Sequence, residues 1–155
     1  MDFRIVALPV ASFAPLFGLP ETELAARGVK RVVADRQPGF PCRVSLRDAA
    51  PGESLLLLNY EHLSSSSPYR SSHAIFVREN AVECVPRVNE IPDVLARRLL
   101  SVRAFDAAGM MLEADVTEGS QVAPLIARYL DDERVGFVHI HNARPGCYAA
   151  QAVRA

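Results

Sequence analysis

The sequence predicts an α+β fold: a single globular domain over residues 1–155, with a mostly antiparallel sheet, one clear amphipathic helix at about 120–131 and short N-terminal helices. Most apolar runs are short and are separated by turn residues, which is typical of strands joined by hairpins. One later segment instead repeats its apolar residues at helical spacing. With 50% hydrophobic residues, a chain of 155 residues can bury a core without disulfides or a structural metal.

The N-terminal part combines short strands and short helices. Residues 3–8, FRIVAL, predict a buried strand, and two short helical segments follow it before Gly28, which suits the left-handed residue after a helix. Residues 29–35 and 42–48 predict strands on either side of the turn sequence RQPGFP. Cys42 shares the apolar face of the second strand and is therefore expected to be buried.

The middle of the chain contains one long polar stretch between apolar strands. Residues 54–60, SLLLLNY, are apolar on both faces and predict a central strand. Residues 61–73 have no periodicity and predict a loop, and loops of this length in compact domains are usually functional or disordered. Residues 74–79 predict another strand with 82–88 as its hairpin partner, after which the segment around Pro92 turns the corner.

Two hairpins frame the predicted helix in the C-terminal half. LLSVRAFD and MMLEADV flank AAG, and RVGFVHIHN pairs with CYAAQAVR at the end of the sequence. Between them, apolar residues recur at i, i+3, i+4, i+7 and i+8 from Val122 to Leu130. Ser120 is the expected N-cap, and Pro124 falls in the first turn, where its missing N–H costs little.

Composition excludes several classes of partner. The net charge of −1 supplies no field for nucleic acid or an anionic membrane. The first residues, MDFRIVALPVASFAPLF, contain an acidic residue and two prolines, which argues against a signal peptide or a membrane span. Three cysteines without CxxC spacing suggest reduced thiols in the cytoplasm. We therefore expect no nucleic acid and no membrane partner, while a homo-oligomer stays open.

The stretch VHIHNARPGCY is the first candidate site. On a strand, His139 and His141 point to one face, about 6–7 Å apart, but two ligands do not make a metal site. A hairpin loop of three or five residues would bring Cys147 to the face of His141, whereas a loop of two or four would bury it on the opposite face. Pro145-Gly146 favours the odd loop. Because no further ligand shows a characteristic spacing, neither a metal nor another cofactor is expected.

The polar stretch 61–73 is the second candidate, and the strand arginines are the third. Tyr69, Arg70 and the serines beside them are groups that bind phosphate or carboxylate, although the same composition also suits a flexible polar loop. Four arginines alternate with apolar residues on predicted strands: Arg43, Arg47, Arg78 and Arg103. Most should face solvent, and one or two could line a pocket.

Four stretches taken together resemble one protein family. They are GFPCRVSLRDAAPGESLLLLNYEH, SPYRSSHAIFVRE, RLLSVRAFDAAGMM and HIHNARPGCYAAQAVR. In this combination the chain resembles the bacterial domain-of-unknown-function family 1203, from about ELAARG to the C-terminus. The family has no established activity, cofactor or catalytic residue to carry over. The positions that match its pattern are Pro41-Cys42-Arg43, Pro68-Tyr69-Arg70, Ile75-Phe76-Val77-Arg78, Arg103, Asn142 and Gly146-Cys147. Where that pattern has Gly-Pro, this chain has His73-Ala74, so the resemblance favours Tyr69-Arg70 over His73.

Three functions follow as hypotheses. The leading hypothesis is an uncharacterised protein that binds a small anionic molecule in a pocket near the 61–73 loop. Arg70 and one of Arg43, Arg78 and Arg103 would hold the anion, and Tyr69 would pack over it.

The first alternative is an enzyme that uses Cys147 as nucleophile with His141 or His139 as base. The second alternative is an interaction or structural module without a small-molecule site, which would carry an apolar patch or a symmetric interface.

Overall fold

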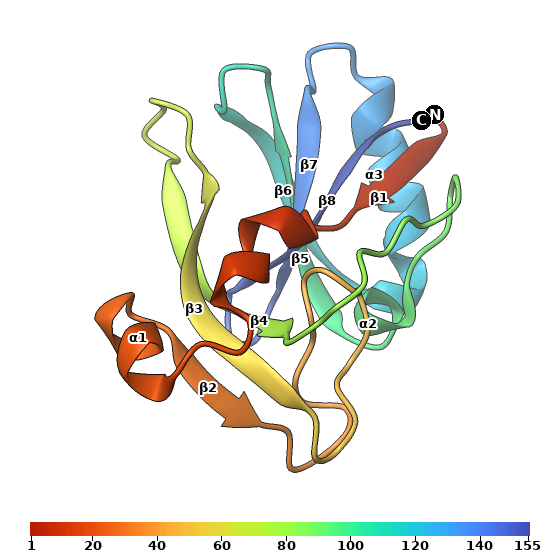
Figure 1. The fold of residues 1–155 in the computed structure, drawn as a ribbon. Helices are drawn as coiled ribbons and strands as arrows, with labels where there is room; N and C mark the ends of the chain where they lie inside the picture. Colours follow the sequence, from red (N-terminus) through yellow and green to blue (C-terminus); the bar gives the residue numbers. More distant parts are fainter.

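Two antiparallel sheets form the framework of the molecule, as Figure 1 shows for the computed structural model of residues 1–155. The larger sheet has the strand order β1-β8-β7-β5-β6 and the smaller one the order β2-β3-β4. The strands of the larger sheet are β1 (Phe3–Val6), β5 (Leu99–Phe105), β6 (Met111–Glu118), β7 (Phe137–Asn142) and β8 (Tyr148–Arg154). Those of the smaller sheet are β2 (Lys30–Val33), β3 (Ser54–Leu63) and β4 (Ser71–Arg78). The predicted α+β class is confirmed.

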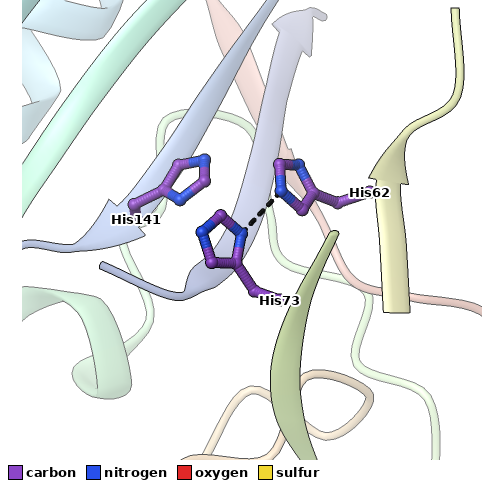
Figure 2. Close-up of side chains that lie close together, drawn as sticks. All are labelled: His62, His73 and His141. Atoms are coloured by element: carbon purple, nitrogen blue, oxygen red, sulfur yellow. Dashed lines mark hydrogen bonds between the residues drawn. The ribbon is translucent and has the colours of Figure 1, made fainter. Parts of the chain in front are cut away.

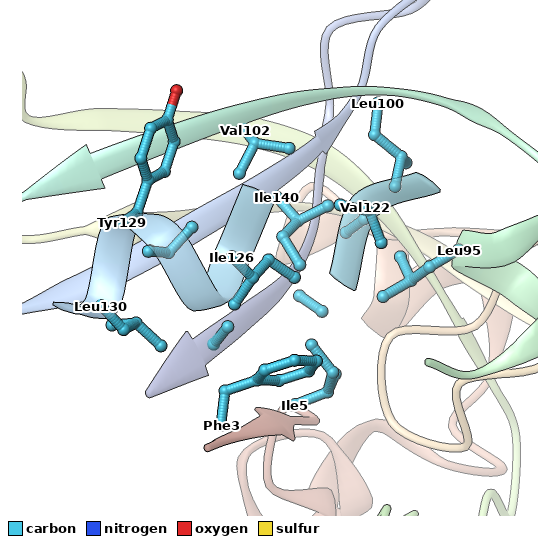
Figure 3. Packing of buried hydrophobic residues seen from close by; sticks show 14 of the residues in the cluster. Phe3, Ile5, Leu95, Leu100, Val102, Val122, Ile126, Tyr129, Leu130 and Ile140 are labelled. Carbon is cyan, nitrogen blue, oxygen red and sulfur yellow. The ribbon is translucent and has the colours of Figure 1, made fainter. Parts of the chain in front are cut away.

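Helix α3 (Val122–Asp131) covers one face of the larger sheet. It is continuous with a 3-10 turn, η3 (Gly119–Gln121), and its apolar side packs on Val102 and Ile140 of the sheet (Figure 3). The predicted helix at 120–131 is confirmed, because its apolar residues recur on one face as the spacing requires. The predicted cap is wrong: Gln121 is the N-cap residue and makes no side-chain capping bond, while Ser120 lies inside η3.

The N-terminal part contains short helical segments, as predicted. These are η1 (Val10–Ser12), η2 (Ala14–Leu16) and α1 (Glu21–Ala26), and a further short helix, α2 (Asp93–Ala96), follows Pro92. Gly28 adopts the left-handed conformation after α1, with φ of 69°. The N-terminal segment packs on the smaller sheet through Phe13 and Leu24, which are both buried. No helix in the structure has the length and apolar character needed to cross a membrane.

Two predicted strands are absent. Residues 42–48 form no strand: only isolated bridges join Pro41 to Asp48 and Cys42 to Phe76, and Leu46 has a positive φ of 51°. Cys42 is buried as predicted, but so is Arg43, which the predicted alternation placed on the other face. Residues 82–88 are also irregular, so they are not the hairpin partner of β4.

The predicted loop at 61–73 is much shorter in the structure. β3 runs on to Leu63 and β4 begins at Ser71, so the connection covers only residues 64–70. The two strands stay hydrogen-bonded beyond the apolar runs from which the sequence predicts them, and Tyr60 lies opposite His73 in this extension. The extension consists largely of polar residues, which lack the β-branched and aromatic character that indicates a strand. The two C-terminal hairpins, β5 with β6 and β7 with β8, are where the sequence predicts them.

Candidate functional site

All four histidines of the chain gather in one cluster between the two sheets. His62 lies on β3 and His73 on β4, whereas His139 and His141 lie on β7. The ring centroid of His62 lies 4.8 Å from that of His73 and 5.0 Å from that of His141. Figure 2 shows His62, His73 and His141 turned toward one another from three strands. We call these four residues the histidine cluster.

Strand periodicity explains how the histidines meet. On β3 the inward residues Leu56 and Leu58 are followed at the same spacing by Tyr60 and His62, and on β4 His73 shares the inward face of Ile75. On β7, Val138 and Ile140 face α3, so His139 and His141 point to the other side of the sheet, as predicted.

A β-bulge also helps to place His62. The pairing of β3 with β4 shifts between Glu61 and Leu63, which leaves His62 without a directly opposite partner. Bulges re-aim side chains and are frequent beside functional sites. Tyr148 stacks on the ring of His62 at 5.1 Å and fills the space beside it.

Hydrogen bonds assign the tautomers in the histidine cluster. The carbonyl oxygen of Gly146 lies 2.9 Å from Nδ1 of His141 and can only accept, so Nδ1 carries the proton and Nε2 keeps its lone pair. Nε2 of His139 donates in the same way to Oε1 of Gln151 at 3.3 Å, and Nδ1 of His139 then accepts from Nδ1 of His62 at 3.4 Å. Nε2 of His62 is left to accept from Nδ1 of His73 at 2.7 Å. Each ring is neutral in this network.

Burial keeps the rings neutral. Loss of solvation lowers the pKa of His62 and of His141 to about 3, and that of His139 to about 4. The pKa of His73 is lowered by the same cause. The nearby guanidinium of Arg103 adds a smaller repulsion that lowers all four pKa values. Neutral imidazoles with free lone pairs accept protons or bind transition metals.

A cavity of about 790 Å³ adjoins the histidine cluster at His73. Five arginines line it, from four separate parts of the chain, whereas Glu118 is the one carboxylate in its wall. The arginines are Arg36, Arg43, Arg97, Arg98 and Arg144. We call this space the arginine cavity.

Buried ion pairing holds part of this wall in place. The carboxylate of Asp48 is almost fully buried and accepts from Nη2 of Arg98 at 2.5 Å and from Nη1 of Arg98 at 3.0 Å. Arg97 approaches the same carboxylate at 3.9 Å. Asp48 therefore balances one arginine of the cavity, while neither Arg43 nor Arg144 forms an ion pair.

Arg43 is a buried cation without a carboxylate partner. Its Nε donates to the carbonyl of Tyr148 at 2.8 Å, its Nη1 to the carbonyl of Pro41 at 2.5 Å and its Nη2 to Sγ of Cys147 at 3.0 Å. Burial lowers the pKa of Arg43, yet an arginine starts so high that it stays charged. An anion in the cavity is therefore a group that could balance this charge.

The structure of the terminal hairpin shows whether its loop has an odd or an even number of residues. His141 pairs with Tyr148, and the N–H of Asn142 donates to the carbonyl of Cys147, so Asn142 stands opposite Cys147. Four residues, 143–146, therefore close the hairpin beyond this pair, and the predicted odd loop is wrong. Cys147 consequently does not share the face of His141. Its sulfur receives hydrogen bonds from Arg43 and, at 3.6 Å, from Nδ2 of Asn142, and it stays half-buried in the cavity wall.

The other predicted ligand residues lie outside the arginine cavity. Arg70 is exposed and paired with Glu61, and Tyr69 stands at the surface with its ring edge toward Phe105. Arg78 is tied to Glu53. Arg103 donates to Ser101 and faces the histidine cluster.

Sequence reasoning missed some residues of the site and undervalued one. The sequence places His62 in the predicted loop at 61–73, and the departure from the family pattern at His73-Ala74 argues against His73. The inward-facing period of two on β3 and β4 is the signal that could have found both. Arg36, Arg97, Arg98 and Arg144 lie on irregular segments, where no periodic signal exists.

Comparison with known families finds a match to the family described as "Protein of unknown function (DUF1203)", over residues 39–154. That segment includes the whole histidine cluster and every arginine of the cavity except Arg36. No match was found among curated proteins or among solved structures. The match extends over most of the chain and bears out the resemblance inferred from the four sequence stretches. The chain therefore belongs to the DUF1203 family, whose function is not known.

Proposed function

We propose that this protein binds a small anionic molecule in the arginine cavity. The observation that carries the proposal is the convergence of five arginines on one cavity in a chain whose net charge is only −1. A nearly neutral composition does not by itself produce a positively charged cavity wall. The fold produces it by bringing these arginines together. Arginine forks suit the planar oxygens of carboxylate and phosphate groups, which they bind through two parallel hydrogen bonds.

The charge balance of the wall supports an anion as the occupant. Asp48 compensates Arg98, and Asp35 pairs with Arg36 at the surface, but Arg43 and Arg144 have no acidic partner. A guanidinium has five N–H donors, and Arg43 uses three of its donor contacts within the chain. An anion beside Arg43 would take the remaining donors and offset the cost of burying its charge.

The dimensions support a metabolite-sized ligand. A cavity of about 790 Å³ falls in the range of roughly 300–1,000 Å³ that is usual for small-molecule sites. Leu57 and Phe76 add apolar surface to the wall, so the ligand would combine an anionic group with an apolar part. This proposal keeps Arg43 from the set predicted by sequence and moves the binding site away from Arg70 and Tyr69.

Replacement of Arg144 tests the proposal. Arg144 is exposed in the cavity wall and forms no ion pair, so Arg144→Gln removes a charge without disturbing the core. With pyrophosphate as the probe in isothermal titration calorimetry, we expect Arg144→Gln to weaken binding about tenfold, the effect of one charge-assisted contact.

The matched control is Arg70→Gln, which removes an exposed arginine outside the cavity. We expect this variant to bind pyrophosphate as the parent protein does. If Arg70→Gln weakens binding and Arg144→Gln does not, the ligand lies at the 64–70 loop as the sequence suggested, and the arginine cavity is not the site.

A second candidate function is catalysis by Cys147. The observation in its favour is the 3.0 Å contact between Sγ of Cys147 and the buried guanidinium of Arg43. A thiolate beside a fixed positive charge is a stronger nucleophile at neutral pH than an isolated thiol. In this version Arg43 and Asn142, in place of the predicted imidazole, would stabilise the sulfur, and the substrate would enter from the arginine cavity.

A further inference from the structure

We propose that His62, His73 and His141 form a binding site for a transition metal ion of the zinc type. One ring nitrogen from each residue lies within 4.8 Å of the others, and the three side chains come from three strands in two sheets (Figure 2). This site goes beyond the anion-binding function proposed above and does not depend on it. Three histidines with one open position form the ligand set of catalytic zinc sites.

The strongest single observation is an unpartnered nitrogen on His141. Its side chain is completely buried, and Nε2 has no hydrogen-bond partner. Because Nδ1 donates to the carbonyl of Gly146, this Nε2 carries a lone pair and no proton. Buried polar atoms are nearly always paired, and leaving one unpaired costs about 1–3 kcal/mol. A metal ion would take this lone pair.

The surroundings already orient the rings as metal ligands require. In metal sites the second ring nitrogen of a ligating histidine usually donates to a carbonyl or another acceptor, which fixes the ring. His141 does so through Gly146, and His62 does so through Nδ1 of His139, which is itself held by Gln151. His139 is thus a positioning residue, and His62 presents Nε2 to the centre of the cluster.

Small rotations convert the cluster into a coordination sphere. Nitrogens at about 2.0–2.1 Å from a tetrahedral zinc ion lie about 3.3 Å from one another. Nε2 of His62 and Nδ1 of His73 are 2.7 Å apart, joined by one shared proton. When that proton moves to Nε2 of His73, both nitrogens offer lone pairs and separate slightly, while the widest spacing in the group closes from 4.8 Å.

The charges around the cluster select the kind of ion. The charged groups that act on it are the guanidiniums of Arg103 and, at His73, Arg43, and no carboxylate takes part. Neutral imidazoles without carboxylate oxygens favour zinc, copper or nickel over magnesium or calcium. The two guanidiniums also favour an anionic fourth ligand. His73 lines the arginine cavity, so that ligand would arrive from the cavity.

Zinc binding to the wild-type protein is the first test. The chain of 155 residues is treated with a chelator, dialysed and titrated with zinc chloride in a buffer free of phosphate. We expect one zinc ion per chain and a higher melting temperature, because the ion binds only the folded arrangement of two sheets. In NMR spectra of the wild-type protein, the nitrogen resonances of His62, His73 and His141 should shift on metal binding. Absence of stoichiometric binding, or binding without these shifts, overturns the proposal.

Two variants test the ligand set. His141→Gln should weaken zinc binding by on the order of 100-fold or more, because one of three ligands is lost. Cys84→Ser is the matched control and should leave zinc binding unchanged, since Cys84 packs against the core around α3 and lies outside the three-histidine group. Zinc affinity that survives His141→Gln, or disappears in Cys84→Ser, contradicts the site. If His141→Gln does not fold, the NMR result for the wild-type protein decides.

The metal and anion proposals fail separately. Arg144→Gln should still bind zinc while binding pyrophosphate more weakly, because Arg144 lines the cavity without belonging to the histidine cluster. Loss of pyrophosphate binding in every form of the protein would remove the anion proposal and leave the metal site intact.

Discussion

Arg43 joins three separate parts of the chain at the candidate site. Its side chain donates to Tyr148 and Cys147 of the terminal hairpin, while its backbone N–H bonds to the carbonyl of Phe76 on β4. Its own carbonyl accepts from the N–H of Leu8. These bonds explain why residues 42–48 are irregular. The backbone N–H and C=O groups of the segment form hydrogen bonds with several neighbouring segments instead of with one strand.

At the same scale, the three cysteines differ in what surrounds their sulfurs. We predict that iodoacetamide at pH 7 modifies Cys147 about tenfold faster than Cys84, because the guanidinium of Arg43 contacts the sulfur of Cys147. Burial and the nearby Glu90 instead raise the pKa of Cys84. Cys42 is buried and should not react in the folded protein. Peptide mass spectrometry after timed quenching measures the rates. If Cys84 reacts as fast as Cys147, the second candidate function loses its basis.

At the scale of elements, the end of α2 and the turn η3 are in contact through a close approach of their backbones. A Cβ atom at Gly119 would lie 1.9 Å from the carbonyl oxygen of Leu95, and the N–H of Gly119 donates to the carbonyl of Arg98 at 2.7 Å. Arg98 also lines the arginine cavity. The close packing at Gly119 thus helps to position one wall of the site.

We predict that Gly119→Ala lowers the free energy of unfolding by about 1–3 kcal/mol, the usual cost of overpacking. Urea denaturation measures the change. Ser120→Ala is the matched control at the next position. Because Ser120 is exposed and makes no capping bond, its loss should change stability by no more than about 0.5 kcal/mol. A loss of about 1 kcal/mol at Ser120 would restore the N-cap that the sequence predicted.

At the scale of the whole molecule, Glu79 connects the N-terminal segment to the smaller sheet. Its carboxylate accepts from Arg31 of β2, from the hydroxyl of Ser54 on β3 and from the N–H of Gly18. The hydrogen bond from Arg31 is the largest cause that lowers the pKa of Glu79 to about 2. Since the pKa is lower in the folded than in the unfolded state, the stabilisation is complete above about pH 4.5 and is lost as the pH falls toward 2.

We predict that Glu79→Gln destabilises the protein by about 1–2 kcal/mol at pH 7 after allowance for solvent screening, and that the difference from the wild type disappears near pH 2. Urea denaturation of both proteins across pH 2–7 measures this difference. Glu133→Gln, at an exposed glutamate without an ion pair, is the control and should differ little at any pH. A penalty at Glu79 that does not vary with pH would mean that packing, and not the charge, is responsible.

The elements with local signals can be predicted from the sequence. The apolar spacing from Val122 to Leu130 sufficed for α3, and turn residues between apolar runs sufficed for the two C-terminal hairpins, because both signals depend on neighbours along the chain. The same reasoning placed His139 and His141 on one face and Val138 in the core. It also selected Arg43 as a candidate ligand residue.

Which residues share a site depends on how the two sheets pack, and local sequence patterns do not show it. His62 and His73 lie close to His141 because the smaller sheet packs against the face of β7 opposite α3. The separation of these residues along the sequence does not indicate that they are close in space. The arginines of the cavity come from irregular segments that are placed by long-range bonds such as the pair between Asp48 and Arg98. A site built from contacts between distant segments is defined by packing, whereas the elements that carry it are defined by local periodicity.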